Sequence, residues 1–267
     1  MLIQSLREMS QRVKNERIKR ILTDVYRYCN LILYTRILRF FGIEKSGDAF
    51  VLTFKRGELK GKRIVFPYSN LIDEAKIATS VMDTFGYLIP PQQSPHLVLD
   101  IGSFPGDFPT IYRLSGRSGK IIALEPDPDN FRYVLLMLHV NGIQADVLNL
   151  GVYREDCLRR FSQKGLESSF SSNGRLEIRS TTIDRIVDSY PVLIKMDIEG
   201  DEIAALEGSK KTLESYSEWV IACYHIIDGE PTYKRLLKMF PDDYVCRLVN
   251  PRHLTLHAYR IQSLNVI

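Results

Sequence analysis

From residue 96 onward, short apolar runs alternate with stretches of helical periodicity. The apolar runs predict strands at residues 96–101, 120–125, 146–151, 193–197 and 218–225, and the periodic stretches predict helices at 107–115, 129–141, 182–189 and 202–216. Strands separated by helices indicate an α/β fold, with a mostly parallel sheet covered by helices on both faces. Such sheets bind ligands beyond the carboxyl ends of their strands. The residues that follow each strand are therefore the first candidates for a functional site.

The first 90 residues follow a different pattern. Residues 5–42 carry apolar side chains at three- and four-residue steps, which predicts an amphipathic helix ending near Gly42. Residues 50–55 and 63–68 predict a short β-ribbon, and residues 70–88 predict another helix. The expected organisation is a helical N-terminal segment (residues 1–45) and one domain (residues 46–267). Within that domain, a polar β insertion is expected at residues 158–180.

Positive charge is concentrated in the N-terminal segment. Residues 1–45 contain ten Lys or Arg and four Asp or Glu, a net charge of +6, whereas the whole chain carries +4. A nucleic-acid-binding domain usually spreads positive charge over one folded face, so nucleic acid is not expected as a partner. The longest uncharged stretch near the start, residues 28–35, is far shorter than the ~20 residues of a membrane span. Arginines also interrupt any signal-peptide core. A cytoplasmic protein is expected.

The N-terminal segment has two candidate partners. Its apolar stripe can pack on the following domain or on a second subunit, which would give a homodimer. Alternatively, its Arg and Lys residues flank Leu31, Leu33, Phe40 and Phe41, a pattern typical of helices that lie on an anionic membrane surface. The second alternative would make the protein peripheral to a membrane and would suit a lipid-linked substrate.

A candidate ligand motif follows the predicted strand 96–101. Asp100 lies near the end of this strand, and Gly102 and Gly106 come before the next helix. Glycines allow positive φ angles and a close approach of ligand to backbone. The spacing differs from the GxGxxG pattern that binds a pyrophosphate. A carboxylate at this point would repel a phosphate and suit an amino group, so a nicotinamide cofactor is disfavoured.

A second acid, Glu125, ends the next predicted strand, 23 residues after Gly102. In related folds a carboxylate at this position accepts hydrogen bonds from ribose hydroxyls. Together the two motifs predict a ligand that has a ribose and an amino acid tail but no phosphate. S-adenosylmethionine is such a ligand.

At this point three segments resemble the FkbM family of class I methyltransferases, within a match of about residues 50–230. They are Leu99-Asp100-Ile101-Gly102 with Gly106; residues 123–128 with Asn130; and Ser180-Thr181-Thr182-Ile183-Asp184 with residues 194–202, Leu206 and Gly208. The third segment is not shared by methyltransferases in general. One departure is local: this chain has Ser103-Phe104-Pro105 where many relatives have an Ala-Asn pair.

The resemblance implies a Rossmann-like fold with a seven-stranded sheet, S-adenosylmethionine as cofactor, and usually transfer to a hydroxyl oxygen. It also implies that Asp100, Gly102, Gly106 and Glu125 contact the cofactor. Asp197 and Glu199 would then face the methyl group and the substrate.

A hydroxyl nucleophile needs a proton acceptor within hydrogen-bond reach. Asp197 ends a predicted strand, Glu199 follows it, and His225 ends another strand, so these three are the candidate catalytic residues. Glu202 is a further candidate, although a carboxylate at a helix start also stabilises the helix dipole. A structural hydrogen bond is the alternative role for His225.

Oxygen and nitrogen ligands for a metal are present in the same segments, at Asp197, Glu199, Asp201 and His225. Spacing within one short turn does not establish a metal site, and none is assigned. The sequence thus predicts an O-methyltransferase acting on a small molecule, a sugar or a lipid-linked glycan. An N-methyltransferase on the same fold and a non-catalytic binding scaffold remain the alternatives, the latter disfavoured by Asp100, Glu125 and Asp197.

Overall fold

The computed structural model describes residues 39–163, 169–170, 173–227, 229–249 and 254–260. The chain forms two compact units that divide between Met82 and Asp83. The division falls within helix α3 (Glu74–Tyr87). Most of the predicted N-terminal helix lies outside the described residues. Its last two residues, predicted as helical, instead begin strand β1, because they pair with residues 53 and 54 of the next strand.

The first unit contains a three-stranded antiparallel sheet. Its strands are, in order, β1 (Phe41–Ser46), β2 (Ala49–Phe54) and β3 (Arg63–Pro67). The predicted ribbon corresponds to β2 and β3. Strand β1 was not predicted, and it adds Phe41, which is fully buried and makes an edge contact with the ring of Phe54. Apolar side chains on alternate positions thus hold this small sheet together.

The second unit is built on a seven-stranded sheet. In spatial order, its strands are β15 (Tyr244–Val249), β16 (Thr255–Arg260), β12 (Ser217–Ala222), β11 (Val192–Met196), β4 (Leu97–Ile101), β5 (Lys120–Leu124) and β6 (Asp146–Leu148). The five strands from β12 to β6 are parallel, and β15 and β16 form an antiparallel hairpin at one edge. The expected mostly parallel seven-stranded sheet is confirmed.

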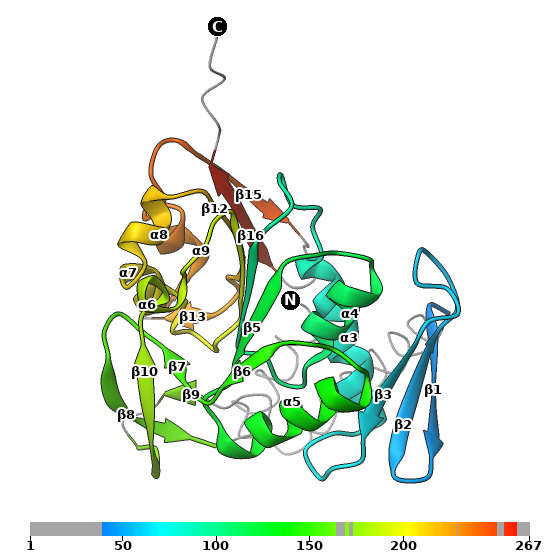
Figure 1. The fold of residues 1–267 in the computed structure, drawn as a ribbon. Helices are drawn as coiled ribbons and strands as arrows, with labels where there is room; N and C mark the ends of the chain where they lie inside the picture. Colours follow the sequence, from blue (N-terminus) through cyan, green and yellow to red (C-terminus); the bar gives the residue numbers. More distant parts are fainter. Residues whose placement is uncertain (1–38, 164–168, 171–172, 228, 250–253, 261–267) are drawn as a thin grey trace, which may run out of the picture. The chain divides into compact units, whose positions relative to one another are not determined.

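Helices lie on both sides of this sheet, α4 (Asp107–Leu114) on one side and the helices that follow β11 on the other (Figure 1). Buried apolar side chains form a core on each face of the sheet. Alternate residues of β4 point to opposite faces, so Leu99 packs in one core and Val98 in the other. Phe108 of α4 belongs to the core that contains Val98. Trp219 and the helices that follow β11 belong to the opposite core. Burial on both faces explains why the central strands are continuous apolar runs.

The remaining helices are short except for α5 (Pro128–Val140), which follows β5. They are α6 (Ile183–Ile186), α7 (Glu202–Glu207), α8 (Lys210–Glu214) and α9 (Tyr233–Leu236). The predicted insertion forms a small sheet of β7 (Gly151–Val152), β10 (Leu176–Thr181), β8 (Cys157–Ser162) and β9 (Ser169–Phe170). A two-stranded ribbon, β13 (Ile226–Ile227) and β14 (Glu230–Pro231), completes the unit. No helix in the described part of the chain has the length and apolar character that a bilayer crossing requires.

Candidate active site

The strand order places the predicted site residues along one edge of the sheet. Strands β12, β11, β4 and β5 are consecutive neighbours and run in the same direction. His225 follows β12, Asp197 follows β11, Gly102 follows β4 and Glu125 follows β5. Residues separated by more than 120 positions in the chain are therefore carried to one edge, as the parallel arrangement predicts.

Gly102 lies at the point where the loops after β4 and β11 meet. Its φ angle is 78°, in the left-handed region that favours glycine. A Cβ atom at this position would lie 1.9 Å from the carbonyl oxygen of Asp197. Gly106 also has a positive φ angle, 94°, and precedes the first residue of α4. Both glycines are thus required by the backbone path of this loop, before any ligand is considered.

Asp100 is completely buried, and partners within the chain hold both of its carboxylate oxygens. The ammonium group of Lys195 lies 2.9 Å from Oδ1, and the hydroxyl of Ser103 donates to Oδ2 at 2.6 Å. Lys195 also donates to the carbonyl oxygen of Gly102 at 2.6 Å. The Asp100–Lys195 pair thus fixes the start of the glycine loop, and sequence reasoning did not identify Lys195.

Lys195 is the one charged residue in the buried strand β11. Burial by itself lowers the pKa of its amine, but the charges of Asp100 and Asp197 outweigh this and raise the pKa above its ordinary value. The side chain is therefore a permanent cation at neutral pH. The sequence did contain a signal that could have identified Lys195. It is a lysine within an otherwise apolar predicted strand, in a chain where another strand ends in an acid.

Glu125 ties the loops after β4 and β5 together. Its carboxylate accepts hydrogen bonds from the backbone N–H groups of Phe104 (3.2 Å) and Asp127 (3.0 Å), and from the side chain of Asn130 (3.5 Å). Burial raises the pKa of this carboxyl to about 7. The local departure from the family pattern has a structural use at Ser103, whose hydroxyl binds Asp100. The contact of Phe104 with Glu125 uses the backbone N–H and does not depend on the Phe104 side chain.

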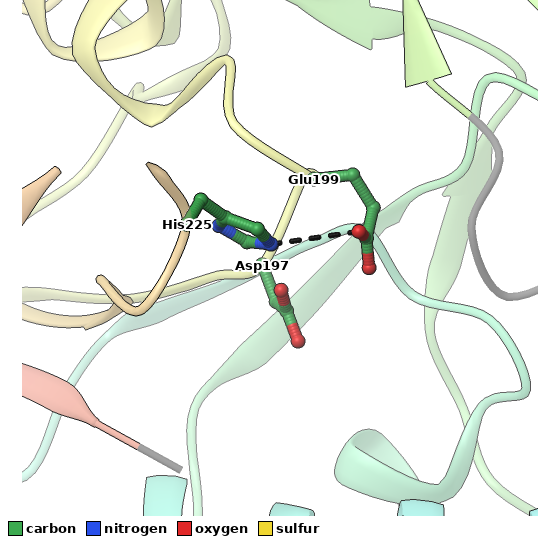
Figure 2. A group of neighbouring side chains, drawn as sticks. All are labelled: Asp197, Glu199 and His225. Atoms are coloured by element: carbon green, nitrogen blue, oxygen red, sulfur yellow. Dashed lines mark ion pairs between the residues drawn. The ribbon is translucent and has the colours of Figure 1, made fainter. Parts of the chain in front are cut away.

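The three candidate catalytic residues lie together, although they come from two loops (Figure 2). Nε2 of His225 lies 3.5 Å from a carboxylate oxygen of Glu199. The phenol hydroxyls of Tyr87 and Tyr224 donate to the Asp197 carboxylate at 2.9 Å and 3.4 Å. Neither tyrosine was identified from the sequence, where neither belongs to a recognisable motif.

Glu199 has a backbone conformation that is uncommon for a residue with a side chain. Its φ angle is 56°, and it is the non-glycine residue with positive φ in the described part of the chain. This region costs roughly 1–2 kcal/mol for an L-residue. Such strain is concentrated at functional sites, where surrounding contacts hold it. Burial raises the pKa of the Glu199 carboxyl above its ordinary value, although the ion pair with His225 acts in the opposite direction.

Acidic neighbours surround His225. Its Nδ1 atom lies 3.2 Å from Oε1 of Glu202. Burial by itself lowers the pKa of the imidazole, but the neighbouring carboxylates of Glu202, Glu199 and Asp197 raise it to about 11. His225 is therefore an imidazolium at neutral pH. It can donate hydrogen bonds and carry positive charge, whereas the carboxylates beside it are the groups able to accept a proton.

The same three residues also offer ligand atoms for a cation, all within 4.8 Å of one another, in the part of the chain that the structure describes. The fourth candidate from the sequence, Asp201, is not in this group. It pairs with Arg159 of the small sheet at 3.2 Å. Arg159 in turn lies over the ring of Tyr153, 3.5 Å from its centroid, which fixes this insertion beside the start of α7.

Comparisons with known proteins agree with this architecture. Residues 100–245 match the family described as the methyltransferase FkbM domain. Among solved structures, the chain is similar to methyltransferase FkbM from Methylobacillus flagellatus KT, with 19% identity and a TM-score of 0.50 over 70% of this chain and 56% of that chain. A methyltransferase from Geobacter sulfurreducens shows 14% identity and a TM-score of 0.40 over 72% of this chain and 92% of that chain. No curated protein matches the chain.

Proposed function

Because the chain belongs to the family of methyltransferase FkbM domains, we propose that it transfers the methyl group of S-adenosylmethionine to a hydroxyl oxygen of a small molecule, a sugar or a lipid-linked glycan. The observation that supports this best is the cluster of Asp197, Glu199 and His225 beside the loop of Gly102. It puts proton acceptors next to the candidate cofactor loop. A hydroxyl acceptor needs such a group, whereas a neutral amine does not.

The chemistry of the residues around the Gly102 loop fits this cofactor. Glu125 offers a buried carboxylate at a strand end, suited to ribose hydroxyls, and no phosphate-binding GxGxxG loop is present in the sequence. Bound there, the cofactor supplies a methyl group on a positively charged sulfur. Gly102 and Gly106 shape the loop against which it lies, and the Asp100–Lys195 pair keeps that loop in place.

On the acceptor side, we assign the proton transfer to Glu199. Its side chain is about a third exposed and its raised pKa makes it a better proton acceptor than an ordinary carboxylate. Glu199 takes the hydroxyl proton while the oxygen forms its bond to the methyl carbon. The bound cofactor would supply the methyl group and retain the electron pair of its carbon–sulfur bond, so charge and atoms balance. Asp197, held by two tyrosine hydroxyls, binds a second hydroxyl of the acceptor.

The proposal is tested by incubating the full chain with methyl-labelled S-adenosylmethionine and matched acceptors that differ only in a hydroxyl or an amine. We expect label transfer to the hydroxyl acceptors. Glu199→Gln should abolish this transfer and should leave cofactor binding unchanged. Transfer to the amine alone would instead identify an N-methyltransferase. Calorimetry should detect binding of S-adenosylhomocysteine and not of NAD; binding of neither, with no label transfer, would favour a non-catalytic scaffold.

A further inference from the structure

We propose that Glu202 is a positioning residue of the acceptor site, which sets the place of the Glu199 carboxylate by binding the turn around it and the imidazole of His225. This inference rests on the role proposed above for Glu199. Glu202 does not touch the acceptor in this scheme. It acts through the turn around Glu199 and through the imidazole of His225.

One oxygen of Glu202 makes all the relevant contacts. Oε1 accepts hydrogen bonds from the backbone N–H groups of Ile198 at 3.1 Å and Gly200 at 3.2 Å. These two amides flank Glu199 on either side. The carboxylate therefore holds the turn in which Glu199 keeps its positive φ angle.

The same oxygen fixes the ring of His225. Because Nδ1 lies 3.2 Å from Glu202, Nε2 is turned toward Glu199, 3.5 Å from Oε2. The exposed fraction of the side chains rises along this chain of contacts, from 0% in Glu202 through 12% in His225 to 30% in Glu199. An acceptor can reach Glu199 from solvent, whereas it cannot reach Glu202.

Helix stabilisation does not explain these contacts. A carboxylate in the first turn of a helix interacts with the free N–H groups of that turn. The Glu202 carboxylate instead binds Ile198 and Gly200, which precede α7, and His225, which follows a different strand. The acceptor-site turn, not the helix, is the structure that this carboxylate organises.

Three variants of the full chain separate the contact of Glu202 with the turn amides from its contact with His225. Glu202→Gln keeps an oxygen that can accept from both amides and removes the charge that faces His225. Glu202→Ala removes both contacts. Glu207→Gln is the matched control, because Glu207 ends the same helix and its partly exposed carboxylate pairs with Arg154 at the surface, at 3.1 Å.

Nuclear magnetic resonance provides a readout that needs no acceptor. The amide signals of Ile198 and Gly200 report on the turn, and the imidazole signals of His225 report on its titration. In Glu202→Gln, we expect these amide signals to stay close to those of the parent chain, while the midpoint of the His225 titration falls by about one pH unit or more. Glu202→Ala should change both readouts, and Glu207→Gln neither.

In the methyl-transfer assay, Glu202→Gln should lower kcat about tenfold or more, with the KM for S-adenosylmethionine unchanged within about twofold. An unchanged His225 titration and an unchanged kcat would overturn the proposal and leave Glu202 as a structural residue of the turn. If Glu202→Ala fails to fold, the Glu202→Gln measurements still decide. If no hydroxyl acceptor is methylated, the proposed reaction fails, whereas the resonance experiment still tests the link from Glu202 to His225.

Discussion

Glu125 is half protonated near neutral pH, because burial raises its pKa to about 7. Two ribose hydroxyls can donate to it fully only when it is ionised, so binding should pull it toward the carboxylate. The affinity for S-adenosylhomocysteine should therefore rise about tenfold between pH 6 and pH 8. Glu125→Gln should bind more weakly and without this pH dependence. Calorimetry at several pH values measures both, and an equally steep rise in the variant would assign the dependence to another group.

The raised pKa of Glu125 has the opposite effect on the free energy of unfolding, which it lowers as the pH rises. The folded-state pKa lies above the unfolded value of about 4.5, so this carboxyl contributes most to stability below pH 4.5. That contribution is lost as the pH rises through about 7. Ligand binding should thus stabilise the protein more at pH 8 than at pH 6, which a thermal shift measurement with S-adenosylhomocysteine can test.

Gly102 is the residue whose substitution should be least tolerated. In Gly102→Ala, the Cβ atom would lie 1.9 Å from the Asp197 carbonyl oxygen, in addition to the cost of a positive φ angle. We expect a loss of about 3 kcal/mol or more in the free energy of unfolding, and loss of cofactor binding. Gly116→Ala is the control, because Gly116 has a φ angle of 74° but open space around its Cβ position. It should cost only about 1 kcal/mol.

At the scale of single residues, the sequence predicts which residues lie at strand ends better than it predicts which side chains they contact. Asp100 and Glu125 were identified because each ends an apolar run, and strand ends are recognisable from local pattern alone. The contact between Asp100 and Lys195 was not predictable, because it depends on the register between β4 and β11, which pairs these residues across 95 positions. The hydroxyls of Tyr87 and Tyr224 reach Asp197 through the same kind of long-range packing.

At the scale of elements, the Asp100–Lys195 pair joins β4 to β11. Lys195→Met should leave the Asp100 carboxylate buried without its cation, and removal of one partner of a buried ion pair costs about 3–5 kcal/mol. The double variant Lys195→Met/Asp100→Asn should cost less than the single variant, because no unpaired charge remains. Urea unfolding monitored by Trp219, the sole tryptophan of the chain, measures both. Equal losses in the two proteins would show that the pair contributes through packing and not through charge.

The local sequence pattern does not suffice to predict where helices begin and end. Residues 202–216 were predicted as one helix from their periodicity, whereas the structure contains α7 and α8 with a break at residues 208–209. The carboxylate of Asp184, 28 residues earlier, accepts hydrogen bonds from the N–H groups of Lys211 and Thr212 and so caps α8. A distant side chain thus stabilises the start of the second helix. The hairpin of β15 and β16, also unpredicted, is specified by its pairing with β12.

At the scale of the whole molecule, the order of the strands converts separate motifs into one site. The residues proposed to bind the cofactor follow β4 and β5, and those proposed to bind the acceptor follow the neighbouring strands β11 and β12. The two halves meet where Gly102 contacts the backbone of Asp197. A parallel sheet was predictable from the alternation of elements, and this common edge follows from it.

Most of the basic N-terminal segment, residues 1–38, lies outside the described residues. These contain eight Lys or Arg and three Asp or Glu, whereas the whole chain carries only +4. Each basic residue near an anionic surface contributes about 1 kcal/mol. The membrane hypothesis therefore predicts that the full chain sediments with anionic vesicles at low salt, is released at high salt, and ignores neutral vesicles. The chain of residues 39–267 should not bind. The segment is a packing element instead if the full chain stays in the supernatant with both kinds of vesicle at both salt concentrations, and if removal of residues 1–38 unfolds the chain or dissociates a dimer.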